Sequence, residues 1–195
     1  MSLRHRRPRT PDPRRFLRTR RVRKARVLLM FVVVLAVLAW LDHTGRLRPR
    51  TDDWTRYHGQ TFIVTRVIDG DTLDIAAPDG GRPTTRVRLW GIDAPEMARY
   101  DTGKPAEPWA EQATDRAREL ALRQRVTLQL QDHRVRGDFG RVLAYVVLPD
   151  GRVLNEVLIE EGHVRAEPRY NHDHMDRYLA LERDAKARHA GKWAR

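Results

Sequence analysis

Alternating apolar and polar residues mark the chain from residue 61 onward. β-branched residues alternate with polar ones in Thr61–Ile68 and Thr72–Ala76, and the alternation returns in Thr84–Trp90 after a turn with one proline and two glycines. A period of two residues is typical of half-buried strands. The pattern therefore predicts a three-stranded antiparallel meander whose first hinge is Asp69-Gly70-Asp71.

The second half of the chain mixes strands with helices. Two further strands are predicted at Arg125–Gln131 and Arg141–Leu148. Apolar residues recur at helical spacing in three other segments: Ala106–Arg123, Leu154–Glu161 and Asp173–His189. Five short strands, interrupted by one helix and followed by two more, predict an α+β fold in which a small five-stranded barrel carries three packed helices.

One apolar segment stands apart from this pattern. Val27–Leu41 is an unbroken apolar run of fifteen residues, and twelve lysines and arginines precede it. A helix that spans a membrane needs about 20 residues, and about 17 at least. The run of fifteen is shorter than this, but the residues on either side of it extend the segment toward the minimum. We expect the segment 27–43 to be a transmembrane anchor or, alternatively, the hydrophobic region of a cleaved signal peptide. The anchor is favoured because no small-x-small cleavage triplet follows the run.

These patterns divide the chain into four parts. Residues 1–26 form a basic arm, 27–43 the membrane or signal segment, 44–58 a linker with mixed charges, and 59–195 the folded domain. By the positive-inside rule the arm stays in the cytoplasm and the domain lies outside. We therefore expect a single-pass protein of the cell membrane that contacts the lipid bilayer through residues 27–41, or a secreted protein if the segment is cleaved.

The positive charge is concentrated at one end of the chain. The formal net charge is +12 and the pI is about 11.0. Residues 1–50 carry 15 lysines and arginines against two aspartates, a net of +13, whereas the other 145 residues carry 23 basic and 24 acidic side chains. The overall basicity is therefore no evidence for a nucleic-acid substrate. The chain has no cysteine, which excludes disulfides and thiolate zinc sites.

Three motifs carry candidate chemistry: R-V-I-D-G-D-T-L, V-R-L-W-G-I-D-A-P-E and D-F-G-R-V-L-A-Y, in that order. Asp71 follows the first strand and Asp93 ends the third, so antiparallel pairing can bring both to one edge of the barrel. Two hard carboxylates, together with backbone carbonyls and water, suit Ca²⁺ or Mg²⁺. The motifs also hold two arginines, Arg88 and Arg141, and a candidate base, Glu96.

This set matches what phosphodiester hydrolysis requires. Water must attack an anion, and the transition state adds charge to the phosphoryl oxygens, so cations are needed near those oxygens and a base beside the water. The planar fork of an arginine can hold two phosphoryl oxygens, which lysine cannot imitate. The motifs therefore predict a metal-assisted phosphodiesterase.

The three motifs and their order resemble the staphylococcal nuclease, or thermonuclease, family from about Thr61 to Trp193. The resemblance implies an OB-fold barrel in which the first helix lies between strands three and four. It also implies a Ca²⁺-dependent nuclease that acts on DNA, on RNA or on both and leaves 3′-phosphate ends. We expect a monomer without a protein partner.

The resemblance assigns roles to residues of this chain. It implies that Ca²⁺ is bound by Asp71, Asp93 and the backbone carbonyl of Ala94, with Asp69 close to the site. Glu96 is implied as the general base for the attacking water. The two arginines that match the catalytic arginines of the family are Arg88 and Arg141.

Aromatic residues are implied as substrate contacts. Phe139 falls where the family places an aromatic beside the bound base, and Tyr170 matches the second of two tyrosines in the nucleotide pocket. Stacking on an aromatic ring tolerates any base, so little sequence selectivity is expected. The chain departs from the family pattern at Pro168, which replaces the first tyrosine, and at Asp138, which replaces a lysine.

Two other functions are compatible with the same fold. One is a catalytically silent OB-fold at the cell envelope that binds nucleic acid or protein, and the other is a structural protein of the envelope. Silent relatives typically lose the acids or the arginines, whereas this chain keeps them all. The nuclease is therefore the favoured prediction.

The stretch from Asn171 to His174 offers a second candidate metal site. Its two histidines, His172 and His174, have the H-x-H spacing of some transition-metal ligands. Asn171 or Asp173 is equally suited to cap the following helix, in which case the histidines face solvent. We favour the cap.

Overall fold

The computed structural model of the chain describes residues 28–40, 52–98 and 103–194. The chain divides into two units, residues 1–49 and 50–195, and each is described by itself.

In the first unit, residues 28–40 form a helix whose apolar side chains are exposed. This helix covers the middle of the predicted membrane segment. The basic arm and the ends of the membrane segment lie outside the described residues. Within the ranges that the structure describes, no helix is both long enough and apolar enough to cross a membrane.

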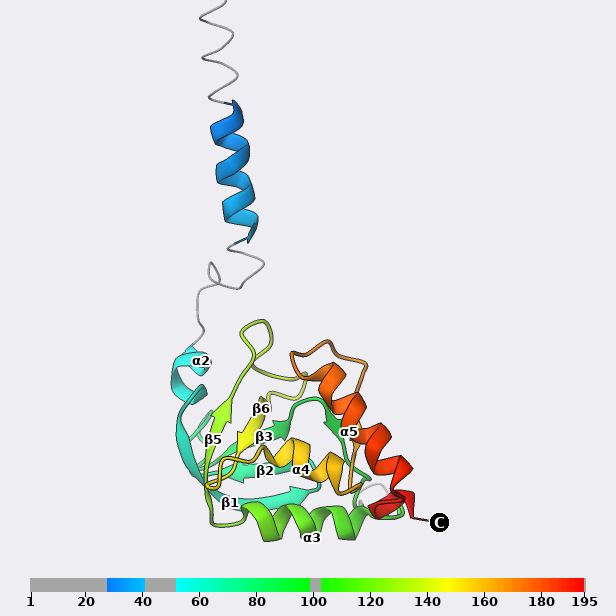
Figure 1. Ribbon diagram of the computed structural model, residues 1–195. Helices are drawn as coiled ribbons and strands as arrows, with labels where there is room; N and C mark the ends of the chain where they lie inside the picture. Colours follow the sequence, from blue (N-terminus) through cyan, green and yellow to red (C-terminus); the bar gives the residue numbers. More distant parts are fainter. Residues whose placement is uncertain (1–27, 41–51, 99–102, 195) are drawn as a thin grey trace, which may run out of the picture. The chain divides into compact units, whose positions relative to one another are not determined.

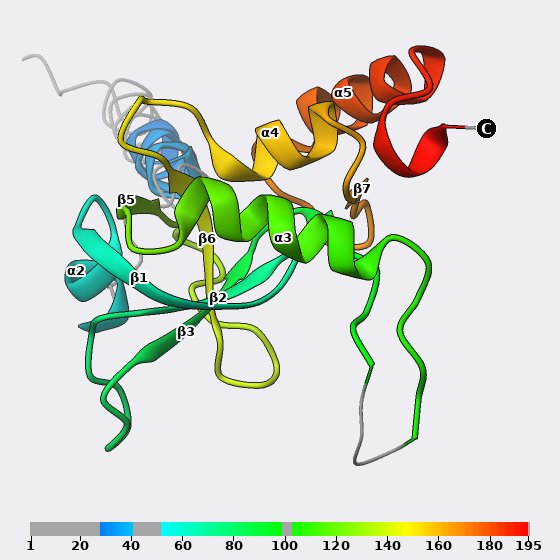
Figure 2. The same cartoon turned by 90° about the horizontal axis from the view of Figure 1, so that it is seen from below.

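The second unit is built on a closed five-stranded barrel with the strand order β1-β2-β3-β6-β5 (Figures 1 and 2). The first three strands form the predicted antiparallel meander. β3 pairs in parallel with β6, and β5 closes the barrel by pairing antiparallel with both β6 and β1. The strands are β1 (Thr61–Asp69), β2 (Thr72–Ile75), β3 (Thr85–Leu89), β5 (Arg125–Gln129) and β6 (Val142–Val147).

The alternation of β3 shows why the sequence forms this barrel. Thr85, Val87 and Leu89 are buried inside it, at 1% exposure or less. The two residues between them, Arg86 and Arg88, point to the other face of the sheet because successive side chains of a strand alternate. The core thus fixes the register that presents Arg88 on the outside of the barrel.

Helices pack around the barrel as predicted. α3 (Ala110–Ala121) lies between the third and fourth barrel strands in the chain and packs along β1; α4 (Leu154–Glu160) packs on β6, and α5 (Met175–Ala187) on α4 (Figure 2). A short 3₁₀ turn, Gly191–Trp193, follows. The face of α3 toward the barrel is lined by buried alanines, which allow close approach. The α+β class and the OB-fold barrel with three packed helices are therefore confirmed.

The predicted linker 44–58 needs correction at its end. Residues 52–57 form a helix, α2 (Asp52–Tyr57), and not a linker. Tyr57 is fully buried, and its hydroxyl lies 3.0 Å from Oγ1 of Thr85 on β3. Tyr57 and the partly buried Trp54 pack this short helix against the barrel core, but six residues are too few to give a periodic signal in the sequence. The folded domain thus includes α2 and begins before residue 59.

A second small sheet lies outside the barrel. β4 (Ile92–Asp93) pairs antiparallel with β7 (Arg165–Ala166), which places Asp93 opposite Arg165. Strands of two residues are too short to give an alternating pattern, so neither was predicted. This sheet holds the chain just after β3 against the segment that follows α4.

Candidate active site

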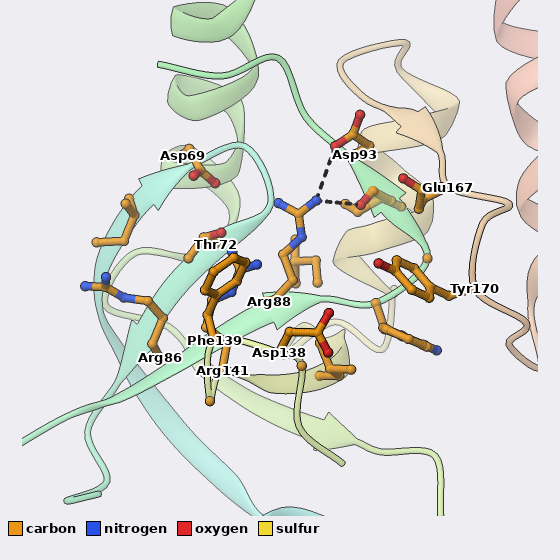
Figure 3. A pocket seen from close by; sticks show the side chains of 18 of the residues that line it. Asp69, Thr72, Arg86, Arg88, Asp93, Asp138, Phe139, Arg141, Glu167 and Tyr170 are labelled. Carbon is orange, nitrogen blue, oxygen red and sulfur yellow. Dashed lines mark hydrogen bonds and ion pairs between the residues drawn. The ribbon is translucent and has the colours of Figure 1, made fainter. Parts of the chain in front are cut away.

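A cavity of about 730 Å³ opens where the ends of several barrel strands meet (Figure 3). Among the described residues that line it, six are arginines and six are aspartates or glutamates. A cavity with both charges suits an anion and a cation together. Seven of the predicted site residues line it: Asp69, Arg88, Asp93, Glu96, Phe139, Arg141 and Tyr170. The other two, Asp71 and Ala94, are buried, with exposed fractions of 1% and 6%.

Asp71 fastens the first hinge to the end of the meander. Its Oδ1 accepts hydrogen bonds from the Thr72 hydroxyl, at 2.9 Å, and from the guanidinium of Arg88. Its Oδ2 accepts the backbone N–H of Ala94 at 2.7 Å. Residues 23 positions apart in the chain are thereby in direct contact.

One guanidinium joins the two predicted metal ligands. Nη1 of Arg88 contacts Asp71. Nη2 donates to Oδ1 of Asp93 at 3.3 Å and to the carbonyl of Ile92 at 3.2 Å (Figure 3). The other carboxylate oxygen of Asp93 accepts a hydrogen bond from Arg165 at 2.6 Å. Because the nitrogens of one guanidinium are close together, both acids face the same small volume, as the sequence predicted.

The hinge depends on a close approach at Gly70. A Cβ atom at this position would lie 2.9 Å from the Cβ atoms of both Ala94 and Ala113, closer than side chains tolerate. The Asp69 carboxylate accepts the backbone N–H of Asp71 at 3.0 Å, which shapes the turn. Burial raises the pKa of Asp69, opposed by the positive charge of Arg88. Glycine and two alanines thus allow the hinge to pack directly on α3.

The donor set fits a hard divalent cation. Asp71 and Asp93 converge on a positive group, and the Ala94 peptide adjoins Asp71. Among the described residues there is no cluster of three histidines, aspartates or glutamates, so such an ion would take its remaining ligands from carbonyl oxygens and water. A bound cation would replace the guanidinium of Arg88 between the acids and leave that side chain to the cavity.

The loop between β5 and β6 presents a second arginine. Arg141 lines the cavity, and its buried Nε has no hydrogen-bond partner among the described residues. Its guanidinium lies 5.5 Å from the ring centre of Phe139, which is 85% exposed. Burial lowers the pKa of Arg88, and the like charge of nearby Arg141 adds to this effect. An unpaired buried donor beside a second cationic side chain favours an anionic ligand.

Tyr170 belongs to an aromatic stack on the opposite wall. Its ring packs on Trp90, with centres 5.8 Å apart, and the guanidinium of Arg134 lies 4.9 Å from the Tyr170 ring centre. Asp138, the residue that departs from the family lysine, accepts a hydrogen bond from Arg134 at 2.6 Å. The negative charge of Asp138 is therefore paired with an arginine of the same cavity.

The comparisons with known proteins agree with this geometry. The family model described as staphylococcal nuclease homologue matches residues 86–195. The chain is 33% identical over 140 residues to the thermonuclease of Staphylococcus intermedius, which covers 72% of this chain and 77% of that protein. The chain belongs to the staphylococcal nuclease family. The relatives named thermonuclease and endonuclease confirm the prediction that the chain is a nuclease.

Two more relatives extend this match. The chain is 28% identical over 169 residues to the thermonuclease of Staphylococcus hyicus, covering 86% of the chain and 95% of that protein. It is 31% identical over 137 residues to an uncharacterized endonuclease of Escherichia coli, covering 70% and 77%. The family model includes Arg88, Asp93 and Arg141 but begins after Asp71. The hydrogen bond between Asp71 and Ala94 shows that the first hinge of this nuclease contacts the segment that the family model matches.

The predicted base of the nuclease, Glu96, lies three residues after Asp93 in the segment that leaves β4. It lines the cavity and is partly exposed. Its backbone is fixed by Glu107, whose N–H donates to the Glu96 carbonyl at 2.9 Å and whose carboxylate accepts the Glu96 N–H at 3.2 Å. The candidate base, Glu96, is thus close in the chain to the candidate metal ligand Asp93, and its backbone is held by Glu107, which precedes α3.

The histidine stretch of the nuclease is structural. His172 was expected to face solvent, but it is 5% exposed and lies 3.2 Å from the hydroxyl of Tyr145. His174 precedes α5 at the N-cap without a side-chain cap bond, and its ring stacks on Tyr178. The prediction of a solvent-facing cap was wrong: His174 is itself the N-cap residue, and Tyr145 and Tyr178 pack against both rings, so that His172 is buried and His174 is half-buried.

Trp90, Arg134 and Glu167 are among the cavity residues that sequence reasoning missed. Trp90 follows a strand and matched an ordinary core position, although its ring forms part of the wall that supports Tyr170. Arg134 and Glu167 are charged residues in irregular segments, which give no periodic signal. Only the fold of the nuclease brings them to the cavity.

Proposed function

We propose that this nuclease hydrolyses phosphodiester bonds of DNA and RNA with Ca²⁺ as cofactor and leaves 3′-phosphate ends. The observation that carries the proposal is the pairing of Asp71 and Asp93 through Arg88, with the unpaired donor of Arg141 on the same cavity. A place for a cation thereby adjoins a place for an anion, as hydrolysis of an anionic ester requires. Ca²⁺ is favoured over transition metals because the donors are oxygens.

Each residue has one part in this proposal. Asp71, Asp93 and the Ala94 carbonyl would hold the ion, which would supply positive charge beside the phosphate. Arg88 and Arg141 hold phosphoryl oxygens and stabilise the charge that develops there. A phosphate held in this way would contact the cavity through Arg88 of β3 and Arg141 of the loop before β6.

The remaining parts concern water and bases. Glu96 takes the proton of the attacking water. Asp69 orders the hinge through the Asp71 N–H, whereas Phe139 and Tyr170 stack on the bases that flank the cleaved bond. The exposure of Phe139 leaves its ring available for such stacking.

The proposal is tested by incubating the full chain with DNA and with RNA in Ca²⁺, Mg²⁺ or chelator, and by mapping the product ends. We expect cleavage with Ca²⁺, inhibition by chelator and 3′-phosphate products. Asp71→Asn should raise the Ca²⁺ concentration needed for half-maximal activity at least about tenfold, because a charged ligand is lost.

Asp74→Asn is the matched control for this variant. Asp74 is also a buried carboxylate on the first meander hairpin and is paired with an arginine of β3, Arg86, but it does not line the cavity. We expect its Ca²⁺ dependence to equal that of the unmodified chain. Cleavage that is unaffected by chelator would rule out the cofactor, and the absence of cleavage with either metal would favour a silent binding barrel.

Glu96→Gln is expected to lower kcat about 10²-fold, because general-base catalysis contributes about that much. Ca²⁺ affinity should change little because the amide keeps the shape of the side chain and Glu96 is not a proposed ligand. Glu167→Gln, another carboxylate of the cavity wall, serves as control. Unchanged turnover of the Glu96 variant, measured in steady state with saturating Ca²⁺, would remove Glu96 from the mechanism.

We also propose that the nuclease domain works outside the cytoplasm. The arginines before the apolar run support this orientation, with residues 1–26 in the cytoplasm and 27–43 as anchor or signal segment. Fractionation of cells and protease digestion of intact cells test it, and N-terminal sequencing shows whether the segment is cleaved. A chain that is found only in the soluble cytoplasmic fraction would contradict the proposal.

A further inference from the structure

Helix α2 is tied to the active-site loop by one arginine. Nε and Nη2 of Arg136 donate to the two carboxylate oxygens of Asp53 on α2, at 2.6 and 2.8 Å. Nη1 and Nη2 of the same side chain donate to the two oxygens of Asp79, in the turn between β2 and β3, at 2.8 and 3.1 Å. The guanidinium also lies 5.9 Å from the ring centre of the buried Tyr57. One side chain therefore joins α2, the β2–β3 turn and the loop before β6.

The same arginine shapes the loop that carries the predicted substrate residues. Nη1 of Arg136 donates to the carbonyl of Gly140 at 2.6 Å, so the side chain closes over its own loop. The backbone N–H of Gly137 donates to the carbonyl of Arg141 at 2.9 Å, and Arg136 pairs with Val142 in an antiparallel bridge. Phe139 stands at the exposed tip of this turn. Because its ring is 85% exposed, packing of Phe139 contributes little to fixing the loop.

We propose that Arg136, held by Asp53 and Asp79, is a positioning residue of this nuclease that fixes Phe139 and Arg141 at the cavity. The inference rests on the proposed function, because those two residues matter only if the cavity binds and cleaves a nucleic acid. It assigns to α2, which lies outside the matched family segment of residues 86–195, a part in activity.

The electrostatics of the contact support a fixed geometry. The side chains of Arg136 and Asp53 are 27% and 28% exposed, so the pair is partly shielded from water. The hydrogen bonds that Asp53 accepts from Arg136 lower the pKa of Asp53. The hydrogen bonds that Arg136 donates to Asp53 and Asp79 raise the pKa of Arg136. A planar guanidinium that meets two carboxylates at once loses little freedom when the loop is ordered.

A closely matched pair elsewhere provides the control. Arg116 of α3 donates through Nε and Nη2 to the carboxylate of Glu161, both at 2.7 Å, and through Nη1 to Glu119 at 2.9 Å. The Arg116 and Glu161 side chains are 31% and 33% exposed, nearly as for Arg136 and Asp53. Neither Arg116 nor its partners line the cavity. Arg116→Gln therefore removes an equivalent contact without touching the loop.

The test uses the full chain with the variants Arg136→Gln, Asp53→Asn and Arg116→Gln, after thermal melting has shown the folded fraction of each. A displaced loop weakens substrate binding through Phe139 and slows cleavage through Arg141, so we expect Arg136→Gln to raise KM and lower kcat, each about tenfold. Asp53→Asn, which removes one of two carboxylates, should change both in the same direction by less.

A structural role predicts a different result. Partial unfolding lowers the concentration of active enzyme, which lowers apparent kcat and leaves KM unchanged. The inference is overturned if Arg136→Gln keeps the KM of the unmodified chain, or if Arg116→Gln raises KM to the same degree. If Asp53→Asn is folded and keeps both the KM and the kcat of the unmodified chain, α2 has no role in positioning the loop, and this part of the inference is overturned as well.

A double variant separates this inference from the proposed function. Arg136→Gln with Asp53→Asn should lose no more activity than Arg136→Gln alone, because both act through the same contact. Additive losses would contradict a shared contact. If Arg141→Lys abolishes activity while Arg136→Gln does not alter it, only the inference fails; if Arg141→Lys keeps full activity, the proposed function of the loop fails instead.

Discussion

Replacement of Arg141 by lysine is expected to lower kcat about 10³-fold, since arginines that clamp a transferring phosphoryl group contribute at least that much. Arg141 is at the end of a turned loop, with its Nε buried in the cavity wall and unpaired among the described residues. A lysine at this position keeps the charge but offers one ammonium in place of a planar fork. It therefore cannot hold two oxygens whose charge grows in the transition state.

The measurement is steady-state cleavage of DNA at saturating Ca²⁺, compared with Arg152→Lys. Arg152 flanks the other end of β6, pairs with Asp150 in an exposed turn and does not line the cavity. We expect that control to keep nearly full activity. KM of the Arg141 variant should change much less than kcat, because the lost contact strengthens only in the transition state. Near-full kcat after Arg141→Lys would remove the clamp from the mechanism.

The parts of the fold that follow a periodic pattern were predictable from sequence. β3 has buried residues at every second position, and Arg88 could be placed on the outer face from that alternation alone. The four residues of β2 are all buried, yet the hinge before it and the turn after it marked its ends. Local chemistry and burial agree in these strands, which is why the barrel and its order of elements could be derived.

The parts that depend on single long-range contacts were not predictable. α2 has six residues, of which Trp54 and Tyr57 pack on the barrel core, and so short a segment resembled a linker in the sequence. β4 and β7 are strands of two residues each that pair across a long stretch of the chain. His172 is buried by Tyr145, which lies 27 residues earlier in the chain. No window of sequence contains both partners of these contacts.

The candidate site shows the same division. The two acids and two arginines could be proposed because each lies at a strand end or turn within a recognisable motif. The occupation of both acids by Arg88, and of Asp93 also by Arg165, could not be proposed, because it depends on side-chain positions. The sequence thus indicates which groups meet, whereas the structure shows that Arg88 contacts two of them, so a cation bound there would compete with that arginine.

This competition leads to a two-part expectation for Arg88→Lys. Turnover should fall about 10³-fold, because the planar fork that serves the phosphate is lost. The concentration of Ca²⁺ that gives half-maximal binding should fall at the same time. The guanidinium contacts Asp71 and Asp93 together, whereas a lysine ammonium is a strongly hydrated point charge that does not span both acids.

Burial of Asp71 makes the second part measurable apart from activity. Its carboxylate is 1% exposed, so loss of the paired guanidinium leaves a buried charge that a divalent ion can compensate. Ca²⁺ should therefore raise the melting temperature of Arg88→Lys by more than it raises that of the unmodified chain. Arg86→Lys, two residues away on β3 and paired with Asp74, should show neither change. An Arg88 variant with weaker Ca²⁺ binding would mean that the guanidinium supports the ion's ligands and does not compete for them.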